Sequence, residues 1–465
     1  MQNNIVKKTD SYKYTHYRQY WPGTQFVYSY FESRNGALFN KTLWYGLQYY
    51  LKEYLAGQVV TKEKIDQAER RALKHFGSLN GTFNRPMWEH VLQMYSGRLP
   101  ILIKAVPEGT LVDVSNVLMS IQNTDPFCFQ LTNHVESLLS KVWYPSTVAT
   151  LSKEIKKMVQ DYTEWTCSSD ALVPFTLHDF GLRGASSEES AALGGSAHLI
   201  NFLGTDTGEG MDLAEEYYSA NEDGLAYSVP ATEHAIMTQK GPSGEEELME
   251  YLLGLYSPEQ IFAWVIDSFN YRRFIEIAGT KLKKIIDERI GKGKIVFRPD
   301  SGDPVSVSLE VIEGLSKYWG YKVNAKGYKE LPSHIGILWG DGIDYQGIRN
   351  ILFAFKNAGW AANNIIFGMG GALLQKPHRD TQRFAFKCSA QCRDGTWYDI
   401  SKNPLDASKA SKPGRLKLGR NSDGHFFTVK DNSEDYQDLL VPVFKDGVIL
   451  KEYTFDEIRA NSNAK

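Results

Sequence analysis

The chain has few cysteines, and their placement excludes two common uses of this residue. Four cysteines among 465 residues are too few for a framework of disulfide bonds. Cys388 and Cys392 are close in sequence, but the second pair that would complete a four-cysteine zinc site is missing. This cysteine content is typical of a reducing compartment, and we therefore expect the protein to be cytoplasmic.

Long apolar runs are absent as well. No segment approaches the roughly 18 consecutive apolar residues that a membrane-spanning helix requires. The first ten residues, MQNNIVKKTD, contain lysines without the apolar stretch that follows them in an export signal. We expect neither membrane insertion nor export.

The net charge is small, −3, and acidic and basic residues are interspersed. Such a distribution gives no electrostatic basis for binding nucleic acid or an anionic membrane surface. The expected partners are therefore small molecules or a second copy of the chain. What the sequence does have is 42% hydrophobic residues over a length typical of roughly two or three domains, so a large core is expected.

A repeated pattern occupies the region between residues 170 and 375, where short apolar runs end in polar or glycine-containing turns. Several of these turns precede segments with helical spacing of apolar residues, such as 271–290 and 344–359. Parallel strands joined by helices in a closed or nearly closed barrel place all their carboxyl-end loops on one face. The runs that define this predicted barrel are PFTLHDFG, HLINFLGTDTG, LAYSVPATEH, FAWVIDSFN, KIVFRPDSG, GILWGDG and NIIFGMGG.

The turn FRPDSGDP carries a cation and carboxylates directly after an apolar strand. Arg298 offers planar, bidentate donation to a phosphate, and Asp300 offers oxygen ligands for ribose hydroxyls or magnesium. Asp267 and Asp341 occupy equivalent places after other strands. An aspartate in a turn more often caps backbone amides than binds a ligand, and we assign that supporting role to Asp303.

Glycines follow two further strands, in Gly340-Asp341-Gly342 and in the run 368–371. Glycine allows backbone amides to approach a phosphate, although most such glycines only permit a tight turn. Arg379 follows the second turn by eight residues. The two turns together suggest a shared phosphate pocket.

Three other turns carry groups for which a structural role is the simpler interpretation when each is taken alone. Phe180 and Arg183 flank a glycine and could hold a flat heterocycle by stacking. Asp206 could accept hydrogen bonds from an amide or could cap a helix. His234 could be a nucleophile, a proton carrier or a structural histidine.

Taken together, these segments resemble the nicotinamide phosphoribosyltransferases, which are type II phosphoribosyltransferases. The resemblance covers nearly the whole chain in the right order. It is carried by TDSYKYTHY, YSYFESR, LHDFGLRGASS, NFLGTDT, YSVPATEH, DSF, RPDSG, GDGID, GGALLQK followed by RD, FKCS and QDLLVPVFKDG.

The resemblance implies a transferase that joins nicotinamide to phosphoribosyl pyrophosphate and releases nicotinamide mononucleotide and pyrophosphate in NAD salvage. It implies a homodimer with shared active sites, Mg²⁺ held mainly through the diphosphate, and ATP as an activating co-substrate. The implied fold is an irregular α/β-barrel-like domain at residues 146–389 and a discontinuous α+β domain built from residues 1–145 and 390–465.

The resemblance also implies a role for each matched residue. Phe180 and Tyr12 of the partner subunit would sandwich the pyridine ring, Arg183 would lie against the base, and Asp206 would accept from the carboxamide NH₂. Asp267, Arg298 and Asp300 would contact ribose and pyrophosphate, with Asp267 or Asp300 a possible magnesium ligand, and His234 would be phosphorylated by ATP. The remaining assignments are Gly340, Asp341, Gly370, Gly371, Arg379 and Lys387 for the 5′-phosphate, Asp10 for substrate, and Arg34, Lys402 and Lys409 for polyphosphate.

Several alternatives stay open. Nicotinate phosphoribosyltransferases share the implied architecture, a sugar-phosphate isomerase or aldolase would share the barrel, and a nucleotide-binding regulator could keep the site without catalysis. Met369 and Ala372 are larger than the residues that usually occupy the glycine turn in the family. We therefore expect the Met369 side chain to narrow the pocket.

Overall fold

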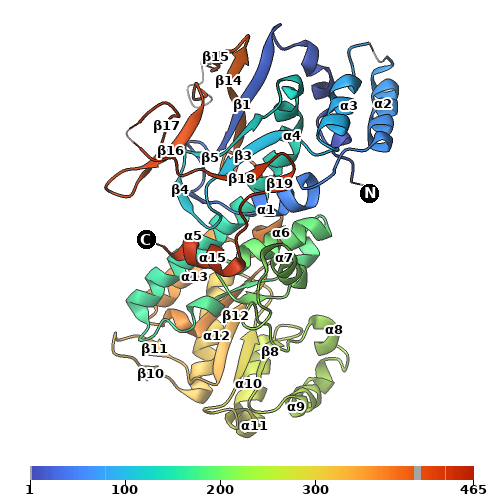
Figure 1. The fold of residues 1–465 in the computed structure, drawn as a ribbon. Coiled ribbons are helices and arrows are strands. Elements are labelled where there is room, and N and C mark those ends of the chain that lie inside the picture. Colours follow the sequence, from blue (N-terminus) through green and yellow to red (C-terminus); the bar gives the residue numbers. More distant parts are fainter. Residues whose placement is uncertain (1–2, 79, 403–409, 435, 465) are drawn as a thin grey trace. The chain divides into compact units, whose positions relative to one another are not determined.

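The computed structural model describes residues 3–78, 80–402, 410–434 and 436–464. Lys409 lies outside them, so its polyphosphate contact stays a prediction. The chain forms two compact units: residues 1–150, 214–220 and 378–465 make the first, and residues 151–213 and 221–377 make the second (Figure 1). These units are not a test of the predicted domain limits after residues 145 and 389, because a compact unit is not necessarily a domain that folds independently. The predicted limits therefore stay predictions.

The first unit is built on a seven-stranded antiparallel sheet that uses both ends of the chain. The long strand β1 (Thr24–Glu32) pairs with β14 (Ala385–Arg393) on one side and with β5 (Val117–Asn123) on the other. This pairing confirms the α+β domain expected from the N- and C-terminal segments. The other strands of the sheet are β15 (Thr396–Asp399), β3 (Ile101–Ala105), β18 (Val441–Lys445) and β19 (Val448–Ile449).

Helix α2 (Lys62–Phe76) shows how local sequence sets the helices of this unit. The Thr61 hydroxyl accepts a hydrogen bond from the Lys64 amide, and Gly77 ends the helix with a φ of +73°. Ile65, Ala68 and Ala72 face the core, as their spacing predicts. The other elements are α1 (Leu47–Tyr50), α3 (Arg85–Met94), α4 (Leu131–Leu139), α15 (Phe455–Asn463), and the paired strands β2 (Lys41–Leu43) with β4 (Leu111–Asp113) and β16 (Leu416–Arg420) with β17 (Phe426–Lys430).

The second unit contains a six-stranded parallel sheet in the order β7-β6-β13-β12-β9-β8. Five of the seven predicted apolar runs supply its longer strands, and HLINFLGTDTG supplies only the short β7, because its first residues end helix α6. The strands are β6 (Leu177–Asp179), β7 (Gly204–Thr205), β8 (Ile261–Val265), β9 (Lys294–Arg298), β12 (Ile335–Trp339) and β13 (Ile365–Met369).

The run LAYSVPATEH bridges the two edges of this sheet without forming a regular strand. Tyr227 makes a parallel bridge with Gly204 of β7, and Ala231 makes one with Ala263 of β8. Pro230 cannot donate a backbone hydrogen bond, which explains why the pairing is limited to isolated bridges. The sheet therefore curls into the irregular, nearly closed barrel that the sequence predicts.

Helices connect the strands of the barrel, and α10, α12 and α13 pack side by side. Asp303 caps α12 by accepting from the Ser306 amide at 2.9 Å, which confirms its supporting role. Within the described residues, no helix is long and apolar enough to cross a membrane. The helices are α5 (Trp143–Thr166), α6 (Glu188–Leu199), α7 (Gly208–Tyr218), α8 (His234–Met237), α9 (Glu245–Leu255), α10 (Tyr271–Thr280), α11 (Lys283–Asp287), α12 (Pro304–Trp319), α13 (Tyr345–Asn357) and α14 (Gly371–Leu374); two short strands, β10 (Lys322–Val323) and β11 (Lys329–Glu330), form a hairpin.

A small apolar core fills the barrel beneath the loops. Ala263, Val296 and Leu338, from three neighbouring strands, are almost completely buried, and Phe180, Val229 and Ile366 pack against them. Because all six strands are parallel, the turns that follow them emerge on one face. The floor of that face is therefore rigid and apolar, and its rim carries the polar residues.

Candidate active site

A cavity of about 350 Å³ opens at the carboxyl ends of the parallel strands. Its volume lies within the range of small-molecule sites, and polar groups from five strand ends converge on it. All of its lining residues belong to the second unit. They are Phe180, Leu182, Arg183, Asp206, Arg298, Asp300, Gly340, Asp341 and Gly370.

The Phe180 ring rests on the barrel core and is shaped by glycines on neighbouring strands. A Cβ atom at Gly368 would lie 2.0 Å from the ring, and one at Gly340 would lie 3.3 Å from it. The Arg298 guanidinium carbon lies 5.7 Å from the ring centroid. The ring is thus confined from several sides, as a stacking platform requires.

We expect Gly368→Ala to impair base binding by displacing this platform. The added methyl group would overlap the Phe180 ring, and the buried strand β13 leaves the ring as the group that moves. Loss of an aromatic contact worth about 1 kcal/mol should raise the KM for the base roughly fivefold to tenfold. Initial-rate kinetics with varied base would measure this change.

The matched control is Gly254→Ala on α9, outside the cavity, since a Cβ atom there would meet no heavy atom within 4 Å. The control should leave the KM for the base near the wild-type value. An unchanged KM in the Gly368 variant, with the fold intact, would contradict the platform role of Phe180.

Arg298 and Asp300 leave the end of β9 together and stay side by side. A guanidinium nitrogen of Arg298 lies 3.4 Å from Asp300 Oδ2, and the two side chains are only 16% and 20% exposed. Partial burial strengthens the field of both charges, because less water screens them. The pair therefore offers a fixed cation for a phosphate and a carboxylate oxygen for a hydroxyl or a metal ion.

His234 and Asp267 form a second polar group at the same face. His234 Nε2 lies 3.2 Å from Asp267 Oδ1, and Nδ1 lies 3.9 Å from Asp300 Oδ2. The Ser301 hydroxyl and the Asp300 amide both donate to Asp267 Oδ2. Two donors therefore hold one oxygen of the Asp267 carboxylate, and the other oxygen faces a histidine that is half exposed.

Asp206 has a partner that the sequence did not reveal. The Ser228 hydroxyl donates to Asp206 Oδ1 from the segment that bridges the sheet edges. Ser301 was missed in the same way. Both serines flank predicted residues in quoted motifs, but a serine in a turn gives no indication of which carboxylate it contacts.

The glycine turn after β13 differs from the expected phosphate loop in two respects. Gly370 lines the cavity, but the following helix, α14, has only four residues. Aligned peptide dipoles contribute little in so short a helix, so the local backbone amides are the relevant donors. The expected narrowing by Met369 is wrong, because Met369 is 1% exposed as the last residue of β13 and does not line the cavity.

Three of the predicted polyphosphate and phosphate contacts lie together in the first unit. Burial lowers the pKa of Lys387, and the positive charges of Arg34 and Lys402 lower it further. The Arg34 guanidinium also donates to the Arg383 carbonyl at 3.1 Å. Such mutual repulsion between cations would be relieved by an anion.

The other predicted residues of the first unit are exposed. The Tyr12 ring is 60% exposed and lies 4.9 Å from the His16 ring. Asp10 accepts a hydrogen bond from the Ser137 hydroxyl at 2.6 Å, and Arg379 is exposed. Exposure at these positions is compatible with contacts to a ligand or to another chain.

Asp300 fits a magnesium site better than Asp267 does. Both oxygens of Asp267 already face donors, whereas Asp300 lines the cavity. Magnesium usually binds one or two carboxylates together with phosphate oxygens and water. The donor set present therefore fits an ion that is held chiefly by a diphosphate.

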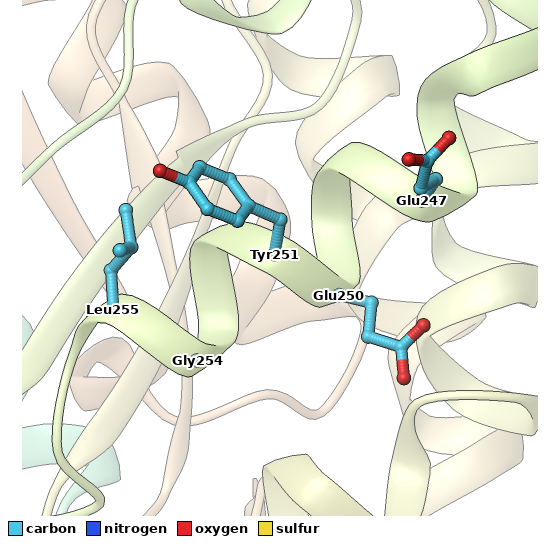
Figure 2. A pocket seen from close by; sticks show the side chains of 5 residues that line it. All are labelled: Glu247, Glu250, Tyr251, Gly254 and Leu255. Carbon is cyan, nitrogen blue, oxygen red and sulfur yellow. The ribbon is translucent and has the colours of Figure 1, made fainter.

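Two other features of the structure could be considered as sites, but polar groups from several elements do not converge on them as they do on the cavity at the strand ends. The hollow along α9 is lined by residues of that helix only, and Figure 2 shows Tyr251 and Leu255 extending to one side and Glu250 to the other. In the first unit, His90, Asp125 and Cys128 are close enough to share a metal ion. However, His90 and Tyr95 already bond Asp125 at 2.8 Å, and burial raises the pKa of the Cys128 thiol, which keeps it protonated.

Comparisons with known proteins identify the family to which the chain belongs. A family model described as the nicotinate phosphoribosyltransferase family matches residues 175–447, and one described as the nicotinamide phosphoribosyltransferase N-terminal domain matches residues 4–103. A nicotinamide phosphoribosyltransferase from Xanthomonas campestris is 44% identical over 99% of this chain and 98% of its own length. The protein of the same name from Acinetobacter baylyi is 32% identical over 98% and 96%.

Solved structures show the same fold at low sequence identity. A nicotinate-nucleotide pyrophosphorylase from Pyrococcus furiosus matches with a TM-score of 0.61 at 16% identity, covering 99% of this chain and 95% of its own. Human nicotinic acid phosphoribosyltransferase matches with a TM-score of 0.56 at 14% identity, covering 98% and 92%. Family models and relatives lead to one conclusion: the chain belongs to the nicotinate phosphoribosyltransferase family.

Proposed function

We propose that the protein joins nicotinamide to phosphoribosyl pyrophosphate, giving nicotinamide mononucleotide and pyrophosphate in NAD salvage. The observation that carries this proposal is that a confined aromatic ring, the Asp206 carboxylate and the Arg298–Asp300 pair line the same cavity. Relatives that bear the name of this activity, at up to 44% identity over nearly the whole chain, support it.

The base would bind against Phe180. A pyridine ring stacked there would lie within reach of Arg183 and Asp206, which line the same cavity. The Asp206 carboxylate can accept a hydrogen bond from a carboxamide NH₂ but repels a carboxylate. This end of the cavity therefore favours nicotinamide over nicotinate.

The donor would bind toward the end of β9 and the glycine turns. Arg298 would hold the diphosphate, Asp300 would contact the ribose, and the turns of Gly340, Asp341 and Gly370 would receive the 5′-phosphate. Displacement at the anomeric carbon develops positive charge on the sugar and negative charge on the leaving pyrophosphate. Fixed charges of opposite sign at these two places lower the barrier, and a protein nucleophile is not required.

Magnesium belongs to the same proposal, with Asp300 as the protein ligand. When bound, the ion would neutralise part of the charge on the departing diphosphate. Arg298 would remain the fixed cation on that group.

The cytoplasmic location expected from the cysteine content also belongs to the proposal.

ATP would act through His234. Transfer of the γ-phosphoryl group to a ring nitrogen would release ADP, and Asp267, 3.2 Å from Nε2, would orient the ring. The phosphohistidine would add negative charge near the site and favour release of the pyrophosphate product. Water would then cleave the N–P bond, releasing inorganic phosphate and regenerating His234. Arg34 and Lys402 would contact the polyphosphate of ATP, together with Lys409, which lies outside the described residues.

Product analysis tests the proposed activity. Purified protein would be incubated with phosphoribosyl pyrophosphate, Mg²⁺ and either nicotinamide or nicotinate, with and without ATP, and mononucleotides would be separated by chromatography. We expect nicotinamide mononucleotide in both nicotinamide reactions and more of it with ATP. Product from nicotinate alone would support the nicotinate phosphoribosyltransferase alternative, and no product at all would support a noncatalytic nucleotide-binding regulator.

We further propose that the protein is a homodimer in which Tyr12 of the partner subunit stacks on the base opposite Phe180. The exposed Tyr12 ring is available for such a contact. Mixing inactive Tyr12→Ala and Asp300→Ala proteins should restore about a quarter of wild-type activity, because random exchange would give half of the dimers one intact site of two. Subunit exchange without any recovered activity would contradict a shared site.

A further inference from the structure

Asp179 lies beneath the base-binding end of the cavity and makes contacts to both loops that form it. It is the last residue of β6, it is 0% exposed, and it pairs in register with Thr205 of β7 and Met369 of β13. Its Oδ1 accepts a hydrogen bond from the Gly181 amide at 2.7 Å. Its carbonyl oxygen accepts one from the Asp206 amide at 2.9 Å.

These two contacts fix the groups that would recognise the base. The Gly181 bond closes the turn that carries Phe180 and Arg183, and a Cβ atom at Gly181 would lie 2.8 Å from Asp179 Oδ1. The carbonyl contact fixes the backbone of Asp206. One buried residue therefore couples the stacking ring to the carboxylate.

The charge of Asp179 is not needed for either contact. A neutral side-chain oxygen closes such turns equally well, as asparagine commonly does. The second oxygen, Oδ2, is buried, and the Thr207 hydroxyl is the side-chain donor that lies beside the carboxyl. Asparagine would keep the accepting oxygen without the cost of a buried charge, so stability alone does not require a carboxylate at this position.

We infer that Asp179 is a positioning and specificity-determining residue, whose carboxylate adds negative potential behind Asp206 and thereby disfavours bases that carry a carboxylate. This inference rests on the proposed function. Burial raises the pKa of Asp179 to about 6, and the carboxylates of Asp206 and Glu209 also raise it. Above pH 7 the group is therefore mostly ionised, and it adds a second negative charge to that of Asp206 at this end of the cavity.

Asp179→Asn tests the inference because it keeps the accepting oxygen and removes the charge. At pH 8, kcat/KM would be measured for nicotinamide and for nicotinate. The value for nicotinamide divided by the value for nicotinate would then be compared between the variant and the wild type. We expect the ratio to fall on the order of tenfold, mainly through a higher value for nicotinate, as one like charge fewer repels it. A purely structural role would lower both values and leave the ratio unchanged.

The matched control is Asp303→Asn, which makes the same chemical change at another strand end. Asp303 caps α12 and lies outside the cavity, and asparagine caps equally well, so the ratio and both kcat/KM values should stay at wild-type levels. Asp179→Glu, which keeps the charge but shifts the turn, should lower both values and preserve the ratio.

An Asp179→Asn protein that folds and keeps the wild-type ratio would overturn the inference. If that variant does not fold, Asp179→Ser, which is also neutral and retains an acceptor, is measured in the same way and judged by the same ratio. Wild-type activity with nicotinamide is measured in parallel, so failure of the proposed function is distinguished from failure of the role assigned to Asp179.

Discussion

Arg298→Ala should lower kcat/KM for phosphoribosyl pyrophosphate by about 10²- to 10³-fold, the range found when one preorganised transition-state contact is removed. The guanidinium is 16% exposed beside Asp300 and is the cation that lines the cavity at the end of β9. In the proposed reaction, its loss would leave the charge of the departing pyrophosphate without a fixed partner. Initial rates with varied donor and saturating nicotinamide would measure the effect.

Two further variants separate charge and geometry from nonspecific damage. Arg298→Lys keeps the charge but loses the planar pair of donors, so its activity should lie between those of the alanine variant and the wild type. Arg272→Ala removes an exposed arginine that pairs with Glu310 outside the cavity, and it should leave kcat/KM near wild type. Equal activity of Arg298→Ala and wild type would exclude a pyrophosphate role for Arg298.

The fold was predictable from the sequence because strand ends carry strong local information. Buried parallel strands give short apolar runs. The turn after each run uses glycine for its backbone conformation and aspartate or asparagine to accept hydrogen bonds from backbone amides. Asp303 illustrates this, since its position before Pro304 predicts a helix cap, and it caps α12. The irregular segment at Tyr227 and Ala231 was harder to predict, because isolated bridges leave no alternating pattern.

Within the site, residue types were predictable and their pairings were not. Arg298, Asp300 and Asp206 follow strands that meet in one sheet, so their convergence follows from topology. The contacts of Ser228 with Asp206 and of Ser301 with Asp267 depend on loop conformation, which the sequence does not encode in a short pattern. Met369 shows the opposite error, where a residue in a functional motif points into the core.

Asp206→Ser should erode the preference for nicotinamide over nicotinate by roughly 10- to 100-fold. In the proposed reaction, the wild-type carboxylate would accept from a carboxamide NH₂ but would repel the charge of nicotinate, and an unmatched like charge in a partly dry site costs a few kcal/mol. Serine removes the repulsion and shortens the side chain, so the variant should also bind nicotinamide less tightly. Competition between the two bases, followed by separation of the two mononucleotides, measures the preference directly.

Asp206→Asn separates the charge from the hydrogen bond. It keeps an oxygen that can accept from the carboxamide and from Ser228, so kcat/KM for nicotinamide should fall less than in the serine variant while the preference still falls. Asp212→Asn, an exposed position farther along α7, is the matched control and should leave the preference unchanged. If the serine and asparagine variants both discriminate as well as the wild type, charge at residue 206 does not select the base, and the selection must come from the shape of the cavity around Phe180 and Arg183.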